Sequence, residues 1–250
     1  MDFRAALLDQ THAFGELIAT GDPETRIPTC PDWTLKQLFR HVGRGNRWAA
    51  QIIAERRLRA LDPREVRDGR PPDDSDAAIA WLNDGAQLVL DAADQVGNSA
   101  RVWTFMGAKP VGWWIRRRVH EVAVHRADAA LALGADFELA PELAADAVSE
   151  WLDRTCVEAT TAHRTPLEPG RTVHLHATDA GLGPTGEWMV RNDDGEIWWS
   201  HDHGKGGVGL RGSATNLLLA VSRRATAADL GLETFGDIGV WDRWLEHTAF

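Results

Sequence analysis

The sequence is poor in the residues that mark several classes of protein. It contains two cysteines, Cys30 and Cys156, far apart in a chain of 250 residues. This content excludes a disulfide-rich scaffold and is typical of a protein from the reducing cytoplasm. No apolar run approaches the ~20 residues that a membrane-spanning helix needs, and the N-terminal segment lacks the layout of a signal peptide. We therefore expect a cytoplasmic protein without a membrane span.

Positive charge is also in deficit. The chain has 27 lysines and arginines against 37 aspartates and glutamates, for a formal net charge of -10. This balance argues against nucleic acid or an anionic membrane surface as the main partner. Tyrosine is absent, whereas there are 12 tryptophans, whose large rings suit pockets and packed helix seams. The length allows one large domain or two smaller ones.

The first half of the chain has the periodicity of helices. Apolar residues recur at three- and four-residue spacing in four segments, roughly 2–20, 34–57, 75–96 and 111–133. Polar or Pro/Gly-rich connections separate these segments. Four helices joined in this way predict an up-down bundle. A fifth helix is expected over 141–162, where Pro141 is well placed to open it.

The second half has the character of a small α+β domain. Short β-like stretches separated by turn residues read RTVHLHATD, GEWMVRND, GEIWWSHD and GVGLRG. Helices are expected over 213–224 and 237–247, with a short strand LETF between them. The predicted fold class is therefore α+β, with a helical-bundle domain over 1–138 and a smaller α+β domain over 139–250.

The run VHEVAVHR carries the most informative motif. Glu121 and His125 lie about 40° apart around a helix, so both side chains leave the same face. Together they form part of a metal site. The zincin pattern His-Glu-x-x-His does not apply, because its second histidine would fall on Val124. His120 points roughly 140° away from His125, so the third ligand must come from elsewhere.

The second helix offers that ligand. Thr34 and Gln37 fit a capping box that marks the start of this helix. An inward stripe then follows at alternating spacings of four and three, and it comprises Thr34, Leu38, His41, Gly45 and Trp48. The matching stripe on the fourth helix comprises Trp114, Arg118, Glu121, His125 and Asp128. Three ligands, His41, Glu121 and His125, would leave one coordination position open, as catalytic zinc requires.

The same two stripes suggest further roles. Asp128 could accept the second N–H of His125 and orient its ring. Arg118 could bind an anionic substrate, or it could neutralise Glu121 or Asp128 as a buried partner. Gly45 would leave space for a ligand to reach the metal. Trp114 would either pack in the core or line the mouth of the pocket and contact a cofactor.

Several segments resemble the mycothiol-dependent maleylpyruvate isomerase family. They read IPTCPDWTLKQLFRHVGRGNRWA, WWIRRRVHEVAVHRADA, ELAADAVSEWL, HLHATD…GEW and LRGSATNLLLAVSRR, in family order across nearly the whole chain. The resemblance implies a DinB-like metal-binding bundle and a C-terminal domain similar to sterol carrier proteins. It also implies zinc held by His41, Glu121 and His125.

The resemblance adds an arginine from the C-terminal domain. The family's arginine at the end of the helix after Leu-Arg-Gly would fall on Arg223 or its neighbour Arg224. This chain departs from the family pattern in two places. Ser222 stands where the family usually has glycine, and Ala127 stands where a tryptophan is common.

The activity implied by the resemblance uses a small-molecule thiol. Zinc would bind mycothiol and lower the pKa of its thiol. The thiolate would add to the cis double bond of maleylpyruvate, the adduct would rotate, and elimination would give the trans product. Arg118 and Arg223 could hold the carboxylates of this small anionic electrophile. The same groups would also serve transfer of the thiol to a related electrophile, in a monomer or a homodimer.

Two other classes of function remain open. A metal-dependent hydrolase could use the same bundle, with Asp128 as the base. A non-catalytic protein could instead hold a small apolar ligand in its C-terminal domain. In that domain, His174 and His176, like His201 and His203, alternate at strand spacing and could form a second metal site. The alternative is that these histidines are half-exposed polar positions.

Overall fold

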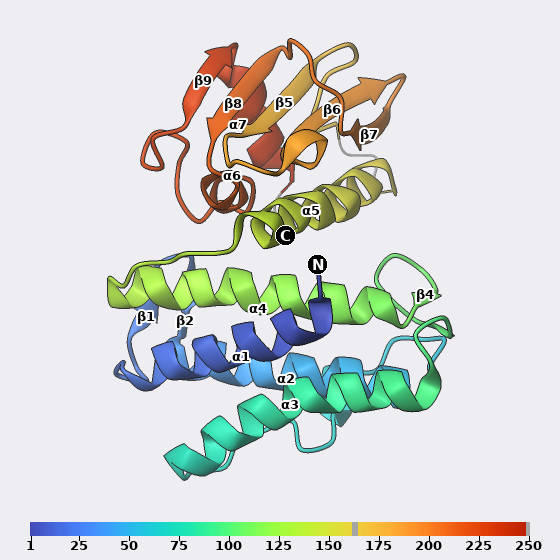
Figure 1. The fold of residues 1–250 in the computed structure, drawn as a ribbon, viewed down its shortest axis with the longest axis vertical. Helices are drawn as coiled ribbons and strands as arrows, with labels where there is room; N and C mark the ends of the chain where they lie inside the picture. The colour runs from blue at the N-terminus through green and yellow to red at the C-terminus, as the bar shows by residue number, and fades with distance from the viewer. Residues whose placement is uncertain (162–164, 249–250) are drawn as a thin grey trace. The chain divides into compact units, whose positions relative to one another are not determined.

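The structure is a computed structural model that describes residues 1–161 and 165–248. The chain divides into two compact units, 1–137 and 138–250. The first unit contains four long helices, labelled in Figure 1: α1 (Phe3–Ala19), α2 (Leu35–Ala54), α3 (Ser75–Val96) and α4 (Gly112–Leu133). Helix α1 packs mainly on α4, and α2 packs mainly on α3. The predicted up-down four-helix bundle is confirmed.

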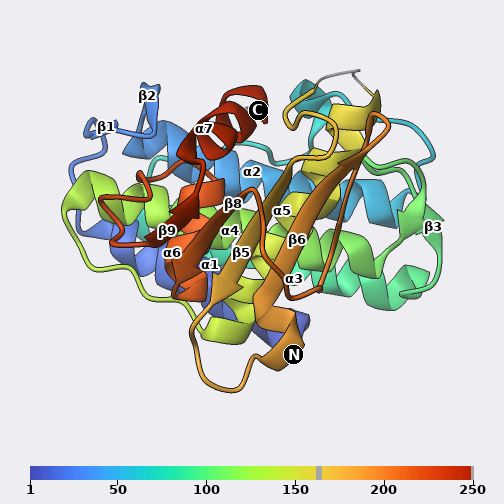
Figure 2. The same cartoon turned by 90° about the horizontal axis from the view of Figure 1, so that it is seen from above.

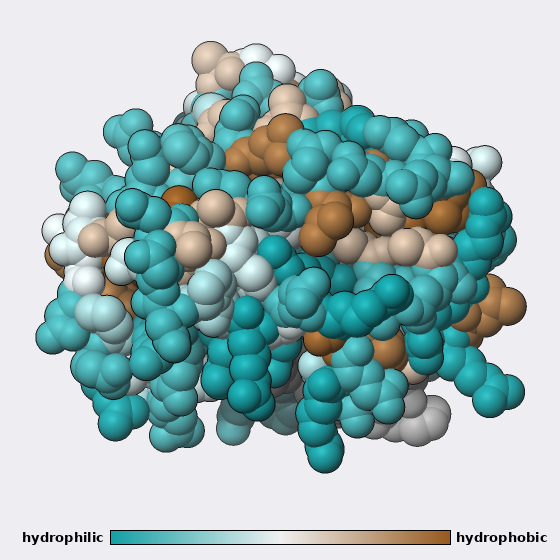
Figure 3. Space-filling model, turned by 90° about the horizontal axis from the view of Figure 1, so that it is seen from below, coloured by the Kyte–Doolittle hydropathy of each residue, from teal (hydrophilic) through white to brown (hydrophobic). Residues whose placement is uncertain are grey.

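Helix α2 shows why these segments fold as predicted. At its start, the backbone N–H of Thr34 donates to Oε1 of Gln37 at 2.8 Å, which is half of the expected capping box. Its apolar residues Leu38 and Val42 are fully buried on one face. Figure 3 shows a face of the molecule that is mostly hydrophilic, with hydrophobic side chains in small separate patches. Amphipathic helices that bury one face and expose the other produce such a surface.

The connections in the bundle contain short elements that the sequence did not predict. Two antiparallel pairs form, β1 (Arg26–Ile27) with β2 (Cys30–Thr34), and β3 (Arg101–Val102) with β4 (Lys109–Pro110). A one-turn 3-10 helix, η1 (Pro63–Glu65), lies between α2 and α3. Strands of two residues are too short to show alternation, so no periodic signal exists for them. The strand β2 leads directly into α2, which begins at the next residue.

In its described part, the second unit is a five-stranded sheet with three α-helices, which confirms the α+β fold class. The elements are α5 (Pro141–Thr161), β5 (Thr172–Ala177), η2 (Gly183–Gly186), β6 (Glu187–Asp193), β7 (Glu196–Ser200), β8 (Val208–Gly212), α6 (Ala214–Val221), β9 (Glu233–Gly236) and α7 (Ile238–His247). The strand order is β7-β6-β5-β8-β9, in which only β5 and β8 pair in parallel. The final residue predicted for the fifth helix, 162, lies outside the described residues.

The sheet has one apolar face and one polar face. Val173 and Leu175 of β5 and Val208 and Leu210 of β8 are buried on one face. Helix α5 contacts β7, and α6 contacts β5 and β8. The residues that alternate with the apolar ones belong to the other face, which includes the histidines of β5. None of the described helices is both long and apolar enough to cross a membrane.

Helices α2 and α3 approach closely at a glycine. A Cβ built on Gly43 would lie 2.1 Å from Cζ3 of Trp81, a ring that is 7% exposed. The indole is further held by the hydrogen bond from its Nε1 to the carbonyl oxygen of Asp68, at 2.7 Å. Because the ring cannot turn aside freely, the contact between the helices requires a residue without a side chain at position 43.

We predict that Gly43→Ala lowers the free energy of unfolding by about 1–3 kcal/mol, because the methyl group would push α2 away from Trp81. Urea denaturation followed by tryptophan fluorescence measures this change. Gly112→Ala is the matched control, because a Cβ at Gly112 meets nothing within 4 Å. Equal stability of the two variants would contradict the proposed packing constraint.

Candidate metal centre

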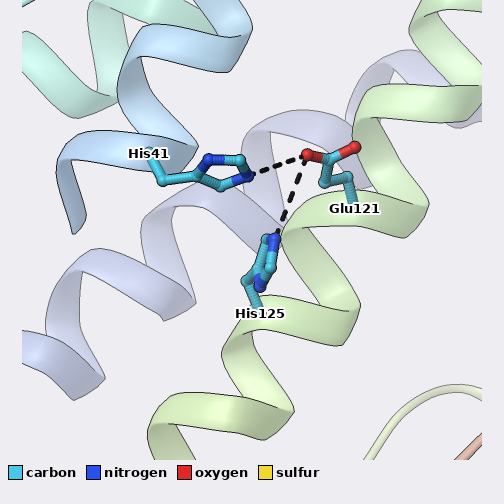
Figure 4. Close-up of side chains that lie close together, drawn as sticks. All are labelled: His41, Glu121 and His125. Carbon is cyan, nitrogen blue, oxygen red and sulfur yellow. Dashed lines mark hydrogen bonds and ion pairs between the residues drawn. The ribbon is translucent and has the colours of Figure 1, made fainter. Parts of the chain in front are cut away.

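Side chains of α2 and α4 converge on one point in the bundle. His41 Nε2 lies 3.1 Å from Oε1 of Glu121, and His125 Nε2 lies 3.9 Å from the same oxygen. One ligand atom from each of the three residues falls within 4.8 Å of the others. Figure 4 shows the two imidazole rings directed at the carboxylate from different helices. Exposed fractions of 31% for the His41 side chain and 13% for His125 make His41 the more accessible ligand.

Two arginines balance the charge of Glu121. Arg117 donates to Oε2 of the carboxylate, and Arg118 Nη1 lies 3.2 Å from Oε1. Burial alone would raise the pKa of Glu121, but Arg117 and Arg118, with smaller contributions from His41 and His125, hold it well below its usual range. The carboxylate is therefore ionised at neutral pH, as a metal ligand must be.

Asp128 determines which nitrogen of His125 carries the proton. Nδ1 of His125 lies 2.8 Å from Oδ2 of Asp128, and the hydroxyl of Thr29 donates to the other oxygen, Oδ1. Because a carboxylate only accepts, Nδ1 of His125 is the donor. Burial lowers the pKa of His125, although Asp128 and Glu121 oppose that shift, so the neutral ring is favoured. Its Nε2 then presents a lone pair toward Glu121.

This donor set fits a divalent metal. The lone pairs of His125 Nε2 and Glu121 Oε1 face one another across 3.9 Å, an arrangement that favours a cation between them. Zinc bonds of about 2.0–2.1 Å at tetrahedral angles place neighbouring ligand atoms ~3.3 Å apart. The observed separations of 3.1 and 3.9 Å bracket that value. Two imidazoles and one carboxylate, with Asp128 orienting one imidazole, are typical of zinc sites with an open position.

Arg118 lies in the interior of the bundle, beside the carboxylate of Glu121. Its side chain is buried, with Nε donating to Oδ1 of Asn46 at 2.8 Å and Nη2 donating to the carbonyl oxygen of Val42 at 3.1 Å. Together with the ion pair to Glu121, these contacts hold the guanidinium inside the bundle. The ion pair with Glu121 that was the alternative expectation is present, while a role of Arg118 toward an anionic substrate stays a prediction.

Two expected ligand-contacting residues also belong to the packed interior. A Cβ at Gly45 would lie 2.7 Å from Nη1 and Nη2 of Arg118, so the guanidinium fills the space predicted for a ligand. Trp114 is 1% exposed and donates from Nε1 to the carbonyl oxygen of Trp103 at 2.8 Å. Its ring packs against Trp48 and Phe105, and contact of Trp114 with a cofactor stays a prediction. Both residues support the fold around the site.

The structure adds residues to the site that the sequence analysis did not single out. Arg117 lies four residues before Glu121, a helical ion-pair spacing that was available in the sequence. Asn46 follows Gly45 on α2 and positions Arg118. Thr29 and Trp33 come from the segment before α2, and the Trp33 ring lies 4.8 Å from that of His41. No sequence pattern links that segment to α4, because the contacts are long-range.

The remaining candidates lie apart from the three ligands. His120 is buried against Phe3, and its helical phase directs it away from His125 as expected. Arg223 is exposed at the end of α6 in the second unit, with a positive φ of 60°, and donates to the carbonyl oxygen of Leu245. Its role toward a substrate stays a prediction, as does that of its neighbour Arg224.

Comparison with known proteins places the chain in a family. The profile described as the mycothiol maleylpyruvate isomerase N-terminal domain matches residues 4–130. The chain belongs to this family. The profile described as the MDMPI C-terminal domain matches residues 142–243. The family is named for an enzyme, and its two profiles correspond to the helical bundle and to the unit that holds the sheet.

Solved structures with the same fold carry the same family name. One is the mycothiol-dependent maleylpyruvate isomerase, with 16% identity and a TM-score of 0.59, covering 90% of this chain and 91% of the other. A second is a histidine-to-alanine mutant of an enzyme with that name, with 16% identity, a TM-score of 0.55 and the same coverage. Among curated proteins, none matches the sequence.

We predict that Arg118→Met lowers the free energy of unfolding of the metal-free protein by about 3 kcal/mol or more, because Glu121 would remain buried with reduced charge balance. Urea denaturation at neutral pH measures this loss. Arg40→Met, at an exposed position of α2, is the control and should change stability little. An Arg118→Met protein as stable as the control would contradict the structural role of Arg118.

Proposed function

We propose that this chain is a zinc-dependent enzyme that uses mycothiol, either as a maleylpyruvate-type cis-trans isomerase or to transfer the thiol to a related electrophile. The observation that carries the proposal is the convergence of His41, Glu121 and His125 within 4.8 Å. These ligands lie in a chain whose family is named for a mycothiol-dependent isomerase.

Each of the three ligands has a distinct part in this proposal. Glu121 supplies the negative charge, because Arg117 and Arg118 keep its carboxylate ionised. His125 is oriented by Asp128, and His41 lies on the accessible side. When bound here, zinc would lower the pKa of a thiol at its open position, so that the thiolate forms near neutral pH. The chain therefore holds and orients the groups on which this activation depends.

Cys156 does not replace the external thiol. Burial raises the pKa of Cys156 to about 12, so this thiol stays protonated at neutral pH. It lies on α5, whereas the three ligands lie on α2 and α4. Neither cysteine forms a disulfide, which fits the reducing cytoplasm in which we propose that the enzyme works.

The reaction requires no redox partner. The thiolate would form a C–S bond with one carbon of the cis double bond, and the electron pair would move onto the carbonyl group of the substrate. Rotation about the resulting single bond and expulsion of the thiolate would give the trans isomer and regenerate the thiol. We propose Arg223 as a partner for a substrate carboxylate, on the basis of the family resemblance and its exposed position.

The geometry does not favour a hydrolase that uses Asp128 as its base. This carboxylate is fully buried, and its two oxygens are engaged by His125 and Thr29. A general base must reach the proton that it removes. Asp128 therefore suits the orientation of His125 better than the activation of a water molecule.

We predict that His41→Ala weakens zinc binding at least ~10-fold and abolishes mycothiol binding to the zinc-treated protein. Metal analysis after dialysis against zinc, followed by calorimetric titration with mycothiol, measures both effects. His12→Ala, which removes an exposed histidine of α1, is the control and should behave like the unmodified chain. Turnover of a maleylpyruvate-type substrate that proceeds equally well without any thiol would refute the proposal.

We also predict that Asp128→Asn lowers zinc affinity about 10–100-fold while all three ligands remain in place. An asparagine can offer its N–H₂ group to His125 and so permit the wrong tautomer. Competition with a chromophoric zinc chelator measures the affinity. Unchanged zinc affinity in Asp128→Asn would show that the hydrogen bond to Asp128 does not orient the ligand.

A further inference from the structure

A second group of histidines surrounds a glutamate in the α+β unit. Glu187 begins β6, and Figure 2 shows β5 and β6 running side by side. His174 Nε2 lies 2.5 Å from Oε2 of Glu187, and His203 Nδ1 lies 2.9 Å from Oε1. His176 Nε2 lies 3.6 Å from Oε1. One ligand atom each from His174, Glu187 and His203 falls within 4.8 Å of the others, as in the helical bundle.

The register of the sheet explains this convergence. His174 and His176 are two residues apart on β5, so both belong to the same face. His176 pairs directly with Glu187 on the antiparallel strand β6. This face is opposite to the one that carries the buried residues Val173 and Leu175.

The loop after β7 brings in the last histidine. His201 Nδ1 lies 2.6 Å from the backbone carbonyl oxygen of Glu187, while His203 reaches the side chain of the same residue. Gly206 allows the returning chain to pass close to His174, because a Cβ at this glycine would lie 3.0 Å from the Cβ of His174. The loop thus holds His203 over the strand pair.

Arginines do not balance the charge of Glu187, in contrast to Glu121. Arg211, which pairs with His176 in the register, forms its ion pair with Glu233 at 2.7 Å. Arg191, on β6 itself, forms its ion pair with Asp202 at 3.2 Å. Among the residues that the structure describes, the ion pairs of the Glu187 carboxylate are with histidines.

This charge balance favours a metal. One carboxylate can neutralise only one imidazolium, whereas three rings surround it. Neutral imidazoles carry a lone pair, and two or three of them with one carboxylate are a donor set that zinc prefers.

We propose that His174, Glu187 and His203, with His176 as a possible fourth ligand, form a second binding site for a divalent transition metal of the zinc type. The side chains of His174 and Glu187 are 11% and 13% exposed, which gives the site a rigid base on the sheet. His203 is 75% exposed and can adjust its ring to the ion. This inference does not depend on the function proposed for the helical bundle.

Zinc stoichiometry tests the proposal in the full-length chain. The unmodified protein, dialysed against micromolar Zn²⁺ and analysed by mass spectrometry, should retain two equivalents per chain. His203→Ala and Glu187→Gln should each retain one, and His41→Ala should also retain one. The double variant His41→Ala/His203→Ala should retain none. His12→Ala, which removes an exposed histidine outside both groups, is the control and should retain two.

The outcomes separate this site from the one in the bundle. Loss of one equivalent in His203→Ala and Glu187→Gln supports the proposal. A single equivalent in the unmodified protein that is lost in His41→Ala overturns the second site and leaves the first intact. Two equivalents that persist in His203→Ala and Glu187→Gln also overturn it, because the second ion would then bind elsewhere.

A spectroscopic titration identifies the ligands more directly. With Co²⁺ as the probe, His41→Ala should show a d–d absorption band from the remaining site, and adding His203→Ala should reduce its affinity at least ~10-fold. Because His203 is exposed, its removal should leave folding intact, and thermal unfolding without metal verifies this. An unchanged titration in the double variant would refute the assignment of His203.

Discussion

The carboxylate of Glu121 places a negative charge among packed helices, and much of the polar interior of the bundle serves to balance it. Arg117 and Arg118 reach it from the preceding turn of α4. Arg118 in turn requires Asn46 and the absence of a side chain at Gly45. An uncompensated buried charge would cost several kcal/mol, so these contacts must form together. The position of the two histidine ligands depends on this arrangement.

The two histidine–glutamate groups of the chain differ in which side chains balance the charge of the glutamate. In the bundle, arginines compensate the carboxylate, and burial lowers the pKa of His125, which favours its neutral ring. On the sheet, Glu187 contacts histidines, while the arginines of the same face pair with Asp202 and Glu233. A glutamate with histidine partners has a charge that a bound cation would complement.

Helical phase explains why the convergence of the candidate ligands in the bundle was predictable. Glu121 and His125 lie four residues apart, and His41 belongs to an inward stripe, so local periodicity assigned each to the correct face. Asp128 followed from the same rule, and its hydrogen bond to His125 is present. Helical phase alone does not distinguish an inward residue that contacts a ligand from one that packs against other side chains. Arg118, Gly45 and Trp114 lie inward as expected and pack in the interior of the fold, and their roles toward a ligand stay predictions.

The sequence by itself determined the four bundle helices, the α+β second half and the faces on which the three candidate ligands lie, because each depends on periodicities of 3.6 or 2 residues. Only the tertiary structure decided what Arg118 contacts and how Thr29 reaches Asp128 across 99 residues of chain. It also decided that His203 meets Glu187 across 16 residues. Such contacts depend on how loops and helices pack in three dimensions, and no local pattern of side chains encodes them.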